Sequence, residues 1–257
     1  MSDRVDIEVG GYRVRIRIDG NTGPIVVLCS GLGGRQLHWG DTVANLAHDH
    51  TVVRFDRPGI PVTRASALDG RRTVRGEAGR IAAVLDAVRR SDRAVVVGHS
   101  LGGLIAGRAA AGFDWATLVL LNSGSGPIHP SQHDRLRLLI NAVDHFSMEQ
   151  IWQAKVAADA ANGLPEPPAD IQDFLHRRFV QTDARGMAAM ARILLDGPQQ
   201  DLSRSTASLL VAFGIDDPDS WSWQTQVHLA QRWRARLALI PHTAHSPAVE
   251  APEATAA

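Results

Sequence analysis

The sequence contains very little cysteine: among its 257 residues Cys29 is the only one. A single cysteine cannot form an intrachain disulfide or build a cysteine metal site. The chain also lacks an apolar run of the ~18 residues that a membrane helix requires. No apolar signal segment precedes the first alternating stretch, so we expect a cytoplasmic protein with no membrane partner.

An excess of charge of either sign is also absent. The chain has 27 lysines and arginines against 27 aspartates and glutamates, and the positive residues are scattered along it. This balance gives no support for a nucleic-acid partner. The length and the 44% of hydrophobic residues are enough for one sizeable core. We expect a small-molecule substrate as the partner, and the oligomeric state stays open.

Short apolar runs recur along the chain, with helical patterns between them. Continuous runs are typical of strands covered on both faces, and two alternating runs at the N-terminus predict a hairpin. Strands that alternate with helices predict an α/β fold, a mostly parallel sheet with helices on both faces. The expected strands are 4–9, 12–18, 25–29, 52–55, 94–97, 118–121, 209–213 and 237–240, and two of the expected helices are 74–88 and 100–111.

The stretch 124–206 breaks this alternation because it lacks β-type runs. It reads instead as amphipathic helices, and a helical insert between sheet strands is typical of a lid over a site. We therefore predict a core formed by residues 1–123 and 207–257, with residues 124–206 as a helical cap. The expected cap helices are 131–145, 147–162, 168–180 and 184–196.

The candidate nucleophile is Ser100, which lies in a Gly-X-Ser-X-Gly pattern between Gly98 and Gly102. A buried strand is expected before the pattern and a helix after it. Such a tight strand-to-helix turn exposes a serine hydroxyl and leaves little room for flanking side chains. The N–H groups and the positive dipole end of the following helix favour an oxyanion there. The alternative is an idle serine on a glycine-tolerant turn.

On these residues the chain resembles the α/β-hydrolase superfamily, most of all its lid-bearing bacterial esterases, lactonases and carbon–carbon bond hydrolases. In that family an acid and then a histidine follow the nucleophile along the chain. The resemblance implies Asp217 as the acid that orients the histidine, with Asp216 and Asp219 as competitors. It also implies His245, after the last strand, as the catalytic base.

The resemblance further implies an oxyanion hole formed by the backbone N–H groups of Leu32 and Leu101. Ser30 stands where the family usually has histidine, which leaves open how this loop is braced. The turn at residues 56–61 resembles a family turn with a different ending, and we interpret it as structural. His242 occupies a position that the family usually gives to glycine.

His242 and His245 also have the spacing of a His-X-X-His metal element, but the pattern includes no nearby acidic or cysteine ligand. We therefore expect no metal and no organic cofactor. Cys29 is interpreted as a small buried core residue, since a catalytic thiol needs a base of its own. Pocket lining and ordinary packing both remain open for the tryptophans Trp39, Trp221 and Trp223.

Together these residues predict a serine hydrolase that forms an acyl-enzyme on Ser100. The expected substrate is a small to medium, largely apolar carboxylic ester or lactone. A second reading uses the same residues to cleave a carbon–carbon bond next to a ketone. A third, from another class, is a binding protein that keeps a hydrolase fold without catalysis.

Overall fold

The structure, a computed structural model, describes most of the chain. The described residues are 2–9, 12–57, 73–88, 94–110, 112, 115–124, 128–196, 201–217 and 221–257. Asp219 and the end of the predicted structural turn, residues 58–61, lie outside them.

The described strands form one eight-stranded sheet in the order β1-β2-β4-β3-β5-β6-β7-β8. The pairs β1–β2 and β2–β4 are antiparallel, and all the other neighbours are parallel. This confirms the predicted α/β fold. The strands are β1 (Ser2–Val9), β2 (Tyr12–Asp19), β3 (Ile25–Cys29), β4 (Thr51–Phe55), β5 (Val95–His99), β6 (Thr117–Leu121), β7 (Ser208–Gly214) and β8 (Arg236–Ile240).

Strand burial follows the sequence pattern. Every residue of β3 and β4 is buried, as expected for apolar strands in the middle of a covered sheet. In β2 the pattern alternates instead: Val14 and Ile16 are fully buried, whereas Arg13 is exposed. The period of two therefore places one face of this strand on the core and the other toward solvent.

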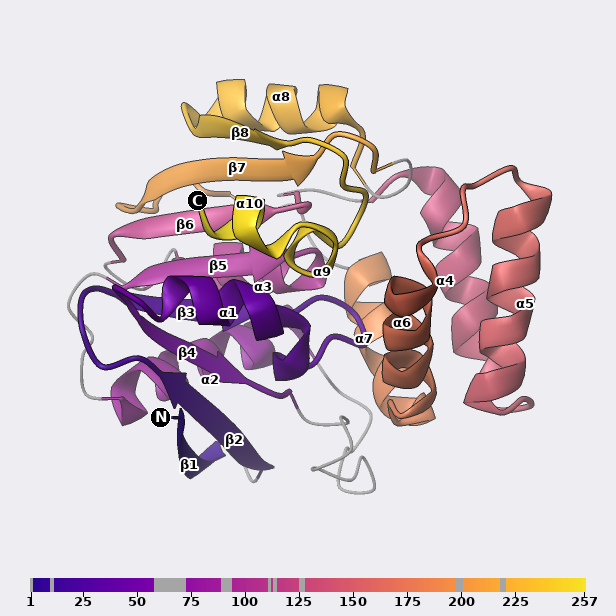
Figure 1. The fold of residues 1–257 in the computed structure, drawn as a ribbon, viewed down its shortest axis with the longest axis horizontal. Helices are drawn as coiled ribbons and strands as arrows, with labels where there is room; N and C mark the ends of the chain where they lie inside the picture. Colours follow the sequence, from indigo (N-terminus) through magenta and orange to yellow (C-terminus); the bar gives the residue numbers. More distant parts are fainter. Residues whose placement is uncertain are drawn as a thin grey trace.

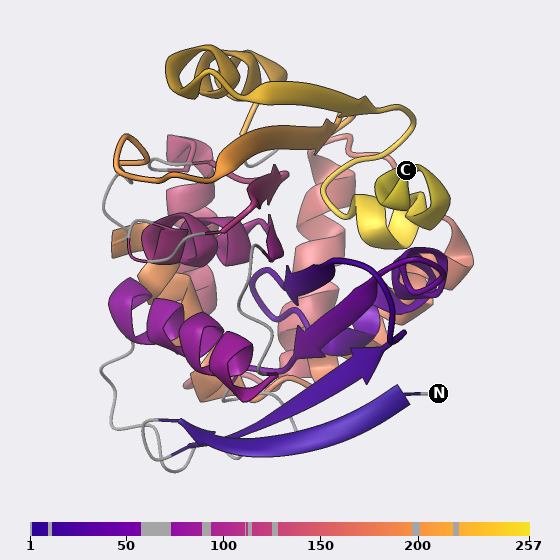
Figure 2. The ribbon, with the colours of Figure 1, turned by 90° about the vertical axis from the view of Figure 1, so that its left-hand side faces the viewer.

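Helices cover both faces of the sheet, and Figure 2 shows α1, α9 and α10 on one side with α2 and α3 on the other. Trp39 and Val43 pack on the first face, and Ile81 and Leu104 pack on the second. The sheet therefore has an apolar core on each side. The described helices outside the predicted insert are η1 (Gln36–Trp39), α1 (Gly40–Leu46), α2 (Val74–Ala87), α3 (Leu101–Ala110), α8 (Trp223–Trp233), α9 (Pro247–Glu250) and α10 (Pro252–Ala256).

The helices of the predicted insert gather together beside one end of the sheet (Figure 1). They are α4 (Pro130–Ala142), α5 (Met148–Ala161), α6 (Ala169–Val180) and α7 (Ala184–Asp196), close to the predicted bounds. Met190 and Ile193 of α7 belong to the main core, whereas α6 has no buried residue. Within the described residues, no helix is long and apolar enough to cross a membrane.

Local sequence explains where these helices begin. Ser147 precedes α5, and its hydroxyl accepts from the backbone N–H of Gln150, while the Gln150 side chain accepts from the backbone N–H of Ser147. This reciprocal pair satisfies two N–H groups that have no partner inside the helix. Pro168 precedes α6, where a missing N–H group costs nothing.

Candidate active site

Ser100 lies at the tight turn between β5 and α3. Its backbone has a φ of 52°, in the left-handed region that a non-glycine residue rarely adopts. Hydrogen bonds hold the turn on both sides: the Ser100 N–H donates to the Leu121 carbonyl at 3.0 Å, and the Ser123 hydroxyl donates to the Ser100 carbonyl at 2.7 Å. Ser100 thus has the strained backbone that the motif predicts.

Close backbone packing explains the glycines of the motif. A Cβ atom on Gly98 would lie 2.5 Å from the Cα atom of Gly103. A Cβ atom on Gly102 would overlap the carbonyl oxygen of Cys29, at the end of β3. Helix α3 can start directly behind the serine only because these positions have no side chain.

The structure brings Ser100, His245 and Asp217 together, although they lie far apart in the sequence. The Nε2 atom of His245 is 3.1 Å from the Ser100 hydroxyl oxygen. Its Nδ1 atom is 2.8 Å from the Asp217 carboxylate. Burial lowers the pKa of His245, but the charge and hydrogen bond of Asp217 outweigh it, so the net pKa is raised above 6.5.

Asp217 contacts the histidine, and neither of its competitors is seen to do so. The Asp216 backbone N–H donates to the Thr243 carbonyl at 3.0 Å, which joins the acid loop to the histidine loop. No contact between the Asp216 side chain and His245 is present in the described part of the chain, and Asp219 lies outside that part. His242 is exposed and has a φ of 56°, a conformation that explains why glycine is usual at its position.

Asn122, which the sequence analysis did not identify, connects the loops that carry the acid and the histidine. It is buried at the end of β6, and its side-chain amide donates to the Asp217 carboxylate at 2.8 Å and to the Ala244 carbonyl at 3.1 Å. Its side-chain oxygen accepts from the Gly214 N–H at 3.0 Å. One buried amide therefore orients the acid and fixes the loop that carries His245.

His99, immediately before the candidate nucleophile Ser100, is a second residue that sequence reasoning missed. Its Nε2 atom is 2.6 Å from the His245 carbonyl oxygen, which can only accept, so Nε2 carries the proton. Burial, more than any other cause, lowers the pKa of His99 to about 3. The ring is therefore neutral at pH 7 and acts as a fixed donor to the backbone of the histidine loop.

The loop after β3 lies against the serine, as the predicted oxyanion hole requires. A Cβ atom on Gly31 would be 3.0 Å from the Ser100 Cβ atom. The buried Arg57 guanidinium donates to the Ser30 carbonyl at 2.5 Å and also to the Gly31 carbonyl. In a trans peptide the C=O and N–H groups point in opposite directions. Because Arg57 binds the Gly31 oxygen, the Leu32 N–H is turned away from Arg57.

Ser30 braces the same loop from its side chain. The Trp39 indole N–H donates to the Ser30 hydroxyl at 2.9 Å, and that hydroxyl donates to the Arg35 carbonyl at 3.2 Å. Both Ser30 and Trp39 are buried, so water does not compete for these bonds. The histidine that the family usually has at position 30 is therefore replaced by a hydroxyl–indole pair.

The side chains of Cys29, Trp221 and Trp223 take no part in the hydrogen bonds that join Ser100, His245 and Asp217. Cys29 is buried, and burial raises the pKa of its thiol to about 12, so the thiol is neutral at pH 7. Trp221 is buried as well, whereas Trp223 is 57% exposed. The mutual contacts that surround Ser100 in the described structure involve none of these three side chains.

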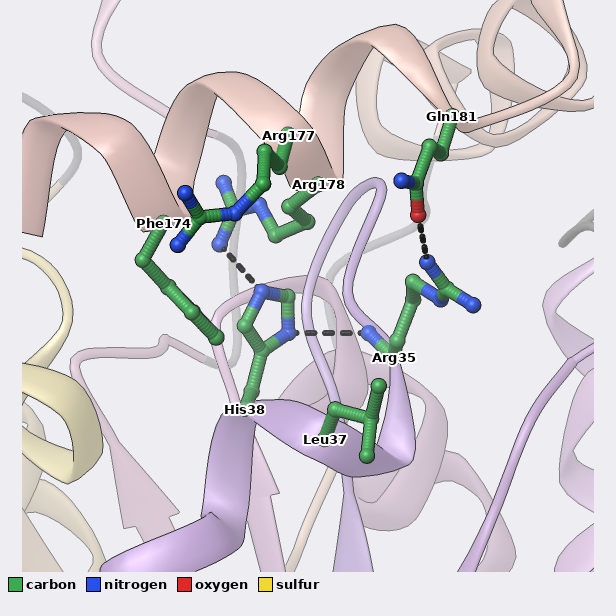
Figure 3. A pocket seen from close by; sticks show the side chains of 7 residues that line it. All are labelled: Arg35, Leu37, His38, Phe174, Arg177, Arg178 and Gln181. Carbon is green, nitrogen blue, oxygen red and sulfur yellow. Dashed lines mark hydrogen bonds between the residues drawn. The ribbon is translucent and has the colours of Figure 1, made fainter.

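A pocket of about 120 Å³ lies between η1 and α6. Figure 3 shows that Arg178 on α6 points toward His38 on η1, with Phe174 beside them. Among the described residues, those that line the pocket include three arginines and no acidic residue. The lining residues are Arg35, Leu37, His38, Phe174, Arg177, Arg178 and Gln181.

Comparison with known proteins places this geometry in a family. A family model described as "Alpha/beta hydrolase family" matches residues 26–257. A curated protein of Pseudomonas savastanoi pv. phaseolicola, named "Putative carbamate hydrolase RutD", is 30% identical over 248 residues, which cover 87% of each chain.

Solved structures are similar over nearly the whole chain. A thermophilic esterase from Thermogutta terrifontis has a TM-score of 0.84 and 20% identity, covering 99% of this chain and 95% of its own. The enol-lactonase from Burkholderia xenovorans LB400 has a TM-score of 0.81 and 22% identity, covering 98% and 96%. At these identities the likeness establishes the fold.

The packing at the turn generates a first prediction. Replacing Gly102 with alanine forces the new Cβ atom onto the Cys29 carbonyl, so we expect a loss of roughly 1–3 kcal/mol of unfolding free energy. Chemical denaturation of the two proteins measures this difference. The matched control is Gly79→Ala in α2, where nothing lies within 4 Å of the added atom. Equal stabilities of G102A and G79A would contradict the packing account.

Proposed function

The chain belongs to the alpha/beta hydrolase family, and on that premise we propose that it is a serine hydrolase with Ser100 as nucleophile, His245 as base and Asp217 as orienting acid. The observation that carries this proposal is the hydrogen-bonded series from the Ser100 hydroxyl through His245 to Asp217, at 3.1 and 2.8 Å. Nucleophile, base and orienting group within hydrogen-bond reach form the signature of nucleophilic catalysis.

In the first step His245 Nε2 takes the proton of the Ser100 hydroxyl while its oxygen attacks the substrate carbonyl carbon. Asp217 accepts the Nδ1 proton of the ring, which fixes the tautomer and stabilises the imidazolium that forms. The negative charge develops on the carbonyl oxygen. The backbone N–H groups of Leu32 and Leu101 are proposed to bind it, because Arg57 orients the first and helix α3 presents the second.

In the second step His245 returns its proton to the leaving group, and the bond between the carbonyl carbon and that group breaks. Water then enters, and His245 removes one of its protons while the water oxygen attacks the acyl carbon. His245 passes this proton to the Ser100 oxygen as the bond between that oxygen and the acyl carbon breaks, and the acid leaves. His99 and Asn122 do not touch the substrate in this scheme. They are positioning residues that hold the loop around His245 through all four proton transfers.

Residues 124–206 are proposed as the cap that selects the substrate, since α6 contributes to a pocket next to the loop of the oxyanion hole. A carboxylic ester or lactone of small to medium size is the proposed substrate class. The proteins to which the chain is similar are named as an esterase, an enol-lactonase and a carbamate hydrolase. Each of those substrate types carries a carbonyl that a serine can attack.

Removal of the nucleophile is the direct test. Ser100→Ala is expected to lower kcat for a p-nitrophenyl ester by ~10⁴-fold or more, because it removes the hydroxyl that lies 3.1 Å from His245 Nε2. Wild-type protein should also be labelled at Ser100 by a fluorophosphonate. The exposed Ser203→Ala serves as a control that keeps full activity and labelling. A loss of under tenfold in S100A, or a folded wild type that stays unlabelled, overturns the proposal.

The raised pKa of His245 generates a pH prediction. The ring must be neutral to accept the serine proton, and Asp217 holds its pKa above 6.5. Activity should therefore be lost as the pH falls, with an apparent pKa above 6.5 in kcat/KM for a neutral ester. A full pH profile measures it. An acid limb centred well below 6.5 would show that a group other than His245 controls the reaction.

The competing carbon–carbon hydrolase uses the same three residues, so substrates must separate the two readings. We expect wild-type protein to hydrolyse a p-nitrophenyl ester and to leave a β-diketone of similar size intact, because the scheme above needs a heteroatom leaving group. Both reactions can be followed by absorbance on one enzyme sample. Turnover of the diketone that S100A abolishes would favour the second reading.

A further inference from the structure

The ring of His38 faces two hydrogen-bond donors, one at each nitrogen, although a neutral ring can accept only one. The Arg35 backbone N–H donates to Nδ1 of His38 at 2.8 Å. On the other side of the ring, a guanidinium nitrogen of Arg178 lies 2.8 Å from Nε2 (Figure 3). A neutral imidazole has one lone pair and one N–H. Because Nδ1 must accept from Arg35, Nε2 carries the proton and faces a second donor.

Protonation of the His38 ring does not resolve this conflict between donors. Protonation would place an N–H on Nδ1 as well, opposite the Arg35 backbone N–H, and would put two cations in contact. Burial first, and then the charge of Arg178, lower the pKa of His38 well below its ordinary value. The neutral ring and the guanidinium therefore present two N–H donors to each other with no acceptor between them.

Arg178 also lacks a counterion. In the described part of the chain no carboxylate lies within 4.0 Å of its guanidinium, and its Nε atom is buried without a hydrogen-bond partner. Its neighbour Arg177 differs, because it is exposed and lies 3.8 Å from Asp173. A partly buried guanidinium with an unpartnered nitrogen and no counterion is costly, so such a group commonly marks a place where a ligand supplies the negative charge.

The pair is linked to the residues around the proposed nucleophile. His38 directly precedes Trp39, whose ring lies 6.4 Å from that of His99, and the His99 ring lies 5.1 Å from that of His245. The charge of Arg178 also lowers the pKa of His99 and opposes protonation of His245, so its field reaches the site. Core and cap each contribute one donor to this place, His38 from η1 and Arg178 from α6.

We infer that His38 and Arg178 together bind a carboxylate group of the substrate, so that this hydrolase acts on esters or lactones that carry a free carboxylate. A carboxylate oxygen between the two N–H groups would accept from both and would neutralise the guanidinium. The inference rests on the proposed function, and it adds an anionic end to a substrate that the sequence predicts to be largely apolar. The pocket holds no acidic side chain, among the described residues, that would repel such a group.

Matched esters test this assignment. p-Nitrophenyl half-esters of glutarate, adipate and suberate are compared with neutral isosteres in which an isopropyl group replaces the carboxylate, each corrected for spontaneous hydrolysis. The chain-length series covers the unknown span from Ser100 to the anion. Wild-type kcat/KM for the best half-ester should exceed that of its isostere by at least about tenfold, the effect of one charge-assisted contact.

The variant Arg178→Gln removes the charge and keeps a polar side chain at this position of α6. It should lose roughly 10- to 100-fold in kcat/KM on the half-ester and less than about threefold on the isostere. Arg178→Lys should fall between the two, since it keeps the charge without the planar fork. The control Arg137→Gln removes the same charge from an exposed position on α4, 3.3 Å from Asp134, and should leave the preference unchanged.

The outcomes separate the two proposals. If R178Q lowers both esters equally, or neither, then Arg178 has only a structural role and the carboxylate assignment is wrong. If wild type turns over both ester types without preference, the assignment is wrong as well, while the proposed function stands. If neither ester is hydrolysed and a fluorophosphonate leaves Ser100 unlabelled, the proposed function fails, and the inference fails with it.

Discussion

The left-handed backbone of Ser100 is the constraint around which the rest of the molecule is arranged. The backbone conformation of a non-glycine residue at φ 52° costs about 1–2 kcal/mol, and the surrounding residues must offset this cost. They do so through main-chain contacts: β6 accepts the Ser100 N–H, Ser123 donates to its carbonyl, and α3 approaches β3 at Gly102. Ser100 is thus held in place by its main chain, through contacts to the neighbouring strands β3 and β6 and to Ser123.

Most of the sheet could be predicted from the sequence, because strands buried on both faces appear as continuous apolar runs. The runs at 25–29 and 52–55 are wholly apolar or nearly so, and both became fully buried strands. The four helices of residues 124–206 were also located within a few residues, since amphipathic periodicity is a local property. Ser100, His245 and Asp217 were selected from motifs, and the fold brings them within hydrogen-bond reach of one another.

Residues whose partners come only from tertiary structure were not accessible in the same way. Asn122 carries no motif, and its importance follows from contacts to loops about 90 and 120 positions away. The only sequence signal was a polar residue directly after a buried strand. Arg57 lay in a turn that was read as structural, and its binding to two carbonyl groups depends on the position of β3. His38 and Arg178 are 140 positions apart in the sequence, so no local pattern could contain their relation.

The bracing of the loop after β3 has a consequence for how relatives of this chain can be recognised. Arg57 donates to carbonyl oxygens of the loop, and the Ser30 hydroxyl accepts the indole N–H of Trp39. The side chain at position 30 therefore depends on Trp39, whereas Arg57 binds the backbone of the loop whichever side chain stands there. The residues at positions 30 and 39 should consequently change together during evolution. A signature that requires a histidine in this loop would miss chains of this kind, whereas one that accepts the serine together with the tryptophan would include them.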